Sequence, residues 1–230
     1  MKRFIAWMLV LILLMPMLAL GEKFSATDAA DARRKALRVF RICGFSSEQN
    51  NGGRDYIVRW EEPIRICVAG KPTRADLKEL DGFLMELSLR VPGLPPITRV
   101  DREADANIVI HYCKLREMRD VVPDYEDGNW GSFHFTYRNY RIVGASIGIA
   151  VDKCDQRARN HLMREELVGA LGLANDHEVY SDSILYQKWT TVQTLSDVDW
   201  IMLNFLYSPL VSPGDKWPEA ERAIRERYGL

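Results

Sequence analysis

Residues 165–176 have the sequence EELVGALGLAND, and this stretch decides how the fold is interpreted. The chain from Gln156 to Leu171 predicts a helix. Gly172 follows directly, and glycine lets the backbone turn sharply because it lacks a Cβ atom. We therefore expect a helix that ends in a sharp turn.

Outward from this stretch, helical and β-rich segments alternate along the chain. Thr73 and Asp76 have the spacing of a capping box, and apolar residues three and four apart follow them. The expected helices cover Ala26–Ile42, Thr73–Arg90, Gln156–Leu171, Ser196–Tyr207 and Pro218–Tyr228, and the expected strands cover Tyr56–Trp60, Ile64–Ala69, Ile97–Val100, Ala106–Cys113, Phe133–Tyr140 and Ile142–Val151. This alternation predicts an α/β (α+β) fold with helices packed on a sheet.

Three further stretches have the order and approximate spacing of a known pattern: DSILY at 182–186, LSDVD at 195–199 and LY at 206–207. Together with residues 165–176 they resemble the metzincin branch of zinc peptidases, whose pattern is H-E-x-x-H-x-x-G-x-x-H. The resemblance implies a zincin-like fold with a twisted mixed sheet and a former active-site helix. It also implies an edge strand near Ile142–Val151, along which a substrate would lie.

The resemblance places the three zinc ligands at Glu165, Gly169 and Asn175, and the general base at Glu166. All three histidines of the pattern are therefore replaced. A glycine has no side-chain ligand atom, and an amide oxygen is a poor ligand for zinc. We expect no zinc and no active zinc peptidase.

A rebuilt metal site is the alternative. His161 stands one helical turn before Glu165, and Asp176 and His177 come just after the expected turn. These four side chains would have to converge, with Glu166 as general base. In the competing interpretation, His161 packs or lies on the surface, Glu165 is solvated and Asp176 caps a turn.

The N-terminus predicts a secretory signal peptide over residues 1–21, because Lys2 and Arg3 precede an apolar run that ends in small residues. An uncleaved anchor is the alternative. Residues 22–54 would then form an N-terminal helix and loop, and residues 55–230 the zincin-like domain. Without Lys2 and Arg3, 29 of the 31 basic residues remain against 32 acidic ones, which gives no indication of nucleic-acid binding. No later segment predicts a membrane span.

Four cysteines remain after the predicted cleavage: Cys43, Cys67, Cys113 and Cys154. In an exported chain an even number predicts two disulfides, with three connectivities open. Buried free thiols are the alternative.

The whole chain also resembles an uncharacterised bacterial family of secreted zincin-like proteins, in which these histidines are commonly absent. We therefore expect a periplasmic or secreted, non-catalytic protein of the cell envelope that binds a peptide or protein partner. A hydrolase that uses Glu166, and a purely structural envelope component, are the alternatives. Phe133, Phe135 and Tyr137 alternate along one expected strand, which is typical of sheet packing and also suits a binding face.

Overall fold

The computed structural model describes residues 26–45 and 55–230, so the predicted signal peptide and the predicted loop at 46–54 lie outside the described residues. The helices are α1 (Ala26–Phe45), α2 (Arg74–Arg90), α3 (Met118–Val121), α4 (Gln156–Ala170), α5 (Asp197–Leu206) and α6 (Trp217–Tyr228), with 3-10 turns at Glu103–Asp105 and Leu115–Glu117. The strands are β1 (Ile64–Gly70), β2 (Ile97–Arg99), β3 (Ile108–Cys113), β4 (Gly131–Arg138) and β5 (Arg141–Ala150). The predicted α/β class is confirmed.

The strands form one mixed sheet in the order β2-β1-β3-β5-β4. β2, β1, β3 and β5 run parallel to their neighbours, whereas β4 pairs antiparallel with β5. The edge strand predicted near Ile142–Val151 is therefore wrong, because β5 lies inside the sheet and β4 forms the edge. The hairpin turn at Asn139 and Tyr140, both at positive φ, folds β4 back onto the outer side of β5.

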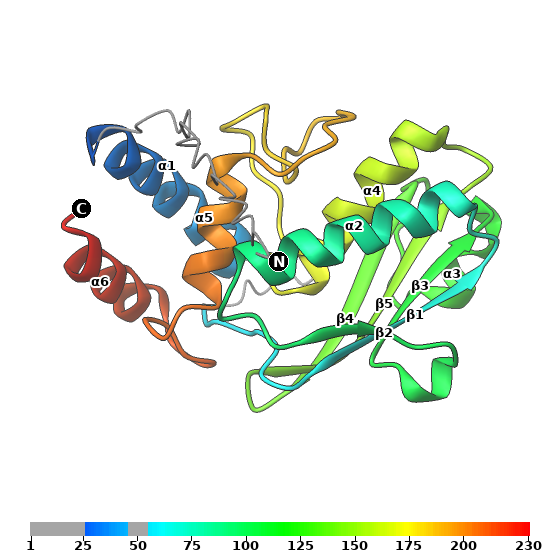
Figure 1. Ribbon diagram of the computed structural model, residues 1–230, viewed down its shortest axis with the longest axis horizontal. Coiled ribbons are helices and arrows are strands. Elements are labelled where there is room, and N and C mark those ends of the chain that lie inside the picture. The colour runs from blue at the N-terminus through cyan, green and yellow to red at the C-terminus, as the bar shows by residue number, and fades with distance from the viewer. Residues whose placement is uncertain (1–25, 46–54) are drawn as a thin grey trace, which may run out of the picture.

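Helices cover both faces of the sheet (Figure 1), with α2 and α4 on one face and α3 on the other. A Cβ at Gly169 in α4 would meet the Phe133 ring, whereas a Cβ at Gly148 would meet Met118 in α3. Gly148 lies opposite Ser132, the neighbour of Phe133 in β4, so the two glycines define opposite faces. Helices α1, α5 and α6 gather beyond one end of the sheet.

Local sequence signals place α2 over the sheet. The Thr73 hydroxyl accepts a hydrogen bond from the Asp76 backbone, and the Asp76 carboxylate accepts one from the Thr73 backbone, so the predicted capping box is confirmed. Leu80, Phe83 and Leu87 follow at helical spacing and are fully buried. Asp76 also accepts a hydrogen bond from the Gln156 amide at 2.7 Å, which joins the starts of α2 and α4.

Two boundaries differ from the prediction. Tyr56–Trp60 is not a strand, since it makes only isolated bridges from Tyr56 and Arg59. Arg59 instead donates hydrogen bonds to the carbonyls of Leu206 and Ser208, which ties this segment to the end of α5. Helix α1 continues past Gly44 to Phe45, whose ring packs edge-to-face on a residue of α6.

The predicted disulfides are wrong for the described structure. Cys67, Cys113 and Cys154 are free and buried, so the structure contains none of the possible pairs among the four cysteines. Cys43 and Cys154 belong to the main core, whereas Cys113 belongs to a small separate cluster beside α3. These cysteines therefore act as small apolar residues. Across residues 26–45 and 55–230, no helix combines the length and the apolar character needed to cross a membrane.

Candidate functional site

Helix α4 carries most of the candidate residues, and both of its ends are fixed. Asp155 caps the first turn by accepting a hydrogen bond from the Ala158 backbone at 2.8 Å. At the other end, the Trp60 indole donates to the Ala170 carbonyl at 3.0 Å, and the Tyr207 hydroxyl donates to the Leu171 carbonyl at 2.7 Å. Trp60 and Tyr207 thus anchor the carboxyl end of this helix.

The chain turns at Gly172, as expected. Its φ of +119° is a conformation that other residues rarely adopt, and a Cβ there would come within 2.6 Å of the Val58 carbonyl oxygen. The turn sends residues 173–190 back along α4.

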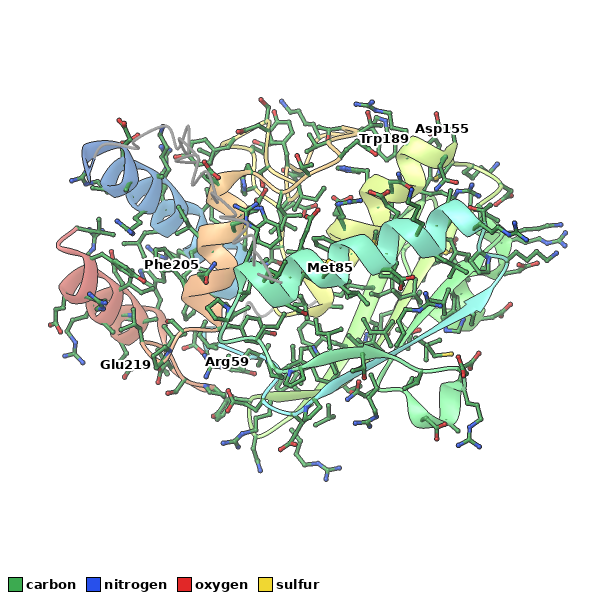
Figure 2. The ribbon with its side chains drawn as sticks, viewed as in Figure 1. Arg59, Met85, Asp155, Trp189, Phe205 and Glu219 are labelled. Atoms are coloured by element: carbon green, nitrogen blue, oxygen red, sulfur yellow. The ribbon has the colours of Figure 1, made fainter. Side chains whose placement is uncertain are left out.

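A cavity of about 310 Å³ lies between α4, the start of β4 and this returning loop. Trp189 projects from the loop at the same end of the molecule as Asp155 (Figure 2). Its ring packs edge-to-face on Trp130, with centroids 5.3 Å apart, and both rings remain partly exposed. The cavity therefore has an aromatic mouth.

Glu166 lies inside this cavity and is only 8% exposed. Burial disfavours its charged form, and the negative charges of Glu165 and Asp176 add to this, so the pKa of Glu166 is raised well above its usual value. Its carboxyl group makes no hydrogen bond to any residue that the structure describes. The wall of this cavity therefore contains a buried carboxyl group that is available to a ligand.

His161 and Glu165 form a pair on the same face of α4. His161 Nδ1 lies 2.8 Å from the Val192 carbonyl oxygen, and its Nε2 lies 3.3 Å from Glu165 Oε2. Both nitrogens face acceptors, which favours the imidazolium form. Burial lowers the pKa of His161, but the hydrogen bond and charge of Glu165 outweigh this, and the pKa is raised overall.

The three positions at which the resemblance places zinc ligands do not fit the metal. Glu165 is paired with His161. A side chain at Gly169 would collide with the ring of Phe133, 2.4 Å from its Cε1 atom. Asn175 is buried and donates from its amide to the Ile42 carbonyl, which connects the loop to α1.

His177 turns away from the cavity into a buried hydrogen-bond network. Ser183 Oγ donates to Asp199 at 2.5 Å, and His177 Nε2 lies 3.1 Å from the same oxygen. Because the Ser183 hydrogen is already used, Nε2 must donate. Nδ1 then accepts from the Val179 backbone, so the imidazole is neutral, and burial lowers the pKa of His177.

The alternative metal set is therefore divided in space. His161 and Glu165 line the cavity with Asp176, whereas His177 belongs to the Ser183 network. Within residues 26–45 and 55–230, no group of three or more His, Cys, Asp or Glu side chains is arranged to hold a metal ion.

Three other polar residues, His111, His134 and Asp127, lie outside the cavity wall. His111 is half-buried on β3, and His134 on β4 lies 3.5 Å from Asp124. Asp127 is paired with Arg119 at the surface. Sequence reasoning missed Trp189 and Thr190 as cavity residues, because nothing local indicates where a long irregular loop returns.

The fold is thus a mixed α/β fold in which an acidic, aromatic-lined cavity lies beside the antiparallel edge strand of the sheet. The sequence profile of the family described as "Protein of unknown function (DUF2927)" matches residues 34–226, and the chain belongs to this family. The expectation of an uncharacterised family is therefore confirmed. No curated protein matches the chain.

Proposed function

We propose that this protein is a non-catalytic, peptidase-derived binding protein of the bacterial cell envelope, in a zincin-like fold. It holds an extended peptide along β4, with one side chain in the cavity. The single observation that carries the proposal is the position of β4: it is the sheet edge, and its first residues, Gly131 to Phe133, form a wall of the cavity.

Strand pairing at this edge needs only backbone groups. The Ala150 backbone donates to the Trp130 carbonyl, so the next inward-facing residues are Ser132 and His134. The N–H and C=O groups of Phe133 therefore point to the outer edge, where no strand within the described residues pairs with them. An added peptide strand would use these groups.

The replaced ligand positions support a binding role over zinc catalysis. Glu165, Gly169 and Asn175 are each committed to another contact, with His161, the Phe133 ring and α1 respectively. Restoring a histidine at position 169 would require the Phe133 ring to move. The site therefore favours capture of a ligand without hydrolysis.

The test uses a positional library of acetylated, amidated hexapeptides against the protein without residues 1–21. We expect selection of an extended sequence that remains intact after prolonged incubation. N-methylation of the peptide amides that face β4 should abolish binding, whereas N-methylation of the alternate amides should not. Equal effects from both sets, or no selected peptide, would refute strand pairing.

A hydrolase is the second candidate, and the raised pKa of Glu166 is the observation that favours it. A general base is most efficient when its pKa lies near the working pH. If the selected peptide is cleaved, Glu166→Gln should lower the rate about a hundredfold to ten-thousandfold. A binder should instead leave the peptide intact.

A further inference from the structure

We propose that the cavity beside β4 takes a cationic side chain, the ammonium group of a lysine or the guanidinium group of an arginine, and holds it between the Glu166 carboxylate and the Trp130–Trp189 pair. That the cation belongs to a bound peptide rests on the proposed function, but cation binding in the cavity can be tested without a peptide.

Glu166 supplies the first argument. Its carboxyl group is more than nine-tenths buried, faces the cavity and has no hydrogen-bond partner among the described residues. A buried polar group without a partner costs free energy that a ligand recovers by pairing with it. A cation is the ligand that pairs most strongly with a carboxylate.

The other charges around Glu166 also favour a cationic ligand. Glu165 and Asp176 both add negative charge near it, and Glu165 is balanced by His161. On the loop, the cavity wall also includes the exposed Lys188. Lys188 is therefore the positive charge of the wall that competes with a bound cation.

The aromatic mouth supplies the second argument. Trp130 and Trp189 are 39% and 56% exposed, so their ring faces are available to a ligand that enters. Cations are attracted to the face of a tryptophan ring. The Thr190 hydroxyl, buried and without a partner among the described residues, adds an acceptor in the same wall.

Binding would release a proton. The protonated Glu166 carboxyl group loses its proton to solvent, and the carboxylate that remains pairs with the incoming cation. Affinity should therefore rise with pH through the raised pKa of Glu166, and the number of protons released should approach one at low pH.

The first test uses n-butylammonium as the probe, with n-butanol as a neutral match, and follows tryptophan fluorescence. We expect saturable binding of the cation only. Glu166→Gln, which mimics the protonated acid and should keep the fold, should weaken binding about tenfold or more. Glu178→Gln, an exposed residue of the same loop outside the cavity, should have no effect. Lys188→Met should strengthen binding.

The second test uses the peptide selected from the library. The peptide residue whose side chain enters the cavity is replaced in turn by lysine, arginine, glutamine or norleucine. Equal affinity for norleucine and lysine, or an unchanged affinity in Glu166→Gln, would overturn the cavity inference and leave strand pairing intact. Binding of n-butylammonium without any bound peptide would uphold the cavity and refute the proposed function.

Discussion

The ring of Phe133, on the edge strand, lies against Gly169 of α4 so closely that a Cβ at position 169 would be 2.4 Å from the ring atom Cε1. We therefore expect Gly169→Ala to lower the free energy of unfolding by about 1–3 kcal/mol, the usual cost of overpacking. Urea denaturation measures this change.

Gly82 provides the matched control for this substitution. It lies within α2, and no atom lies within 4 Å of a Cβ built there. Gly82→Ala should therefore raise stability by up to about 1 kcal/mol through helix propensity. In a Phe133→Leu background, the penalty of Gly169→Ala should shrink or reverse; simple additivity would mean that the ring is not its cause.

The His161–Glu165 pair should make the stability of the protein depend on pH. Because the pKa of His161 is raised above 6.5, the stabilisation from this pair is fully present below pH 6.5 and is lost as the pH rises through the folded-state pKa. Glu165→Gln should lower the pKa of His161, since the opposing effect of burial remains. Titration of the imidazole NMR signals would reveal an unchanged pKa if the pair does not exist in solution.

His177 should make stability depend on pH in the opposite direction. Its pKa is lowered below 6.5, so the unfolded chain takes up a proton before the folded one does, and stability falls as the pH drops below 6.5. We expect Ser183→Ala to cost about 1–3 kcal/mol at pH 7.5, because it leaves the buried Asp199 carboxylate without its hydroxyl donor. An increase in stability toward pH 5 that is traced to His177 would contradict the network.

The hydrogen bond from Tyr207 at the carboxyl end of α4 should contribute to the free energy of unfolding. Tyr207→Phe removes the hydroxyl that donates to the Leu171 carbonyl and leaves a buried acceptor unpaired. We expect a loss of about 1–3 kcal/mol in the free energy of unfolding. Tyr140→Phe, at an exposed tyrosine, is the control and should change stability little.

The elements that the sequence predicted well are specified by local signals. The capping box of Thr73 and Asp76, the proline in the first turn of α6 and the glycine turn at 172 each depend on neighbours a few residues away. Because such signals involve only neighbouring residues, they can be recognised without knowledge of the tertiary structure. The ends of α2, α4 and α6 were therefore predicted to within about two residues.

The missed features depend on contacts between distant segments. Nothing in the sequence of either strand of the 131–150 hairpin indicates which of the two pairs with β3. His177 follows Asp176 directly, yet Asp176 lines the cavity whereas His177 is buried in the core. His177 turns inward because Ser183, which is hydrogen-bonded to Asp199, provides its hydrogen-bond partner. The cysteine count predicted pairs, but Cys67, Cys113 and Cys154 are buried as free thiols, and a count says nothing of where each residue lies.

Hydrogen exchange at the backbone amide of Phe133, measured with and without the peptide selected from the library, tests most directly whether a peptide pairs with the outer edge of β4. This outward amide should exchange fast in the free protein and become protected in the complex, whereas the amides of Ser132 and His134 should be protected in both states. Unchanged exchange at Phe133 in a saturated complex would mean that no peptide strand pairs with this edge.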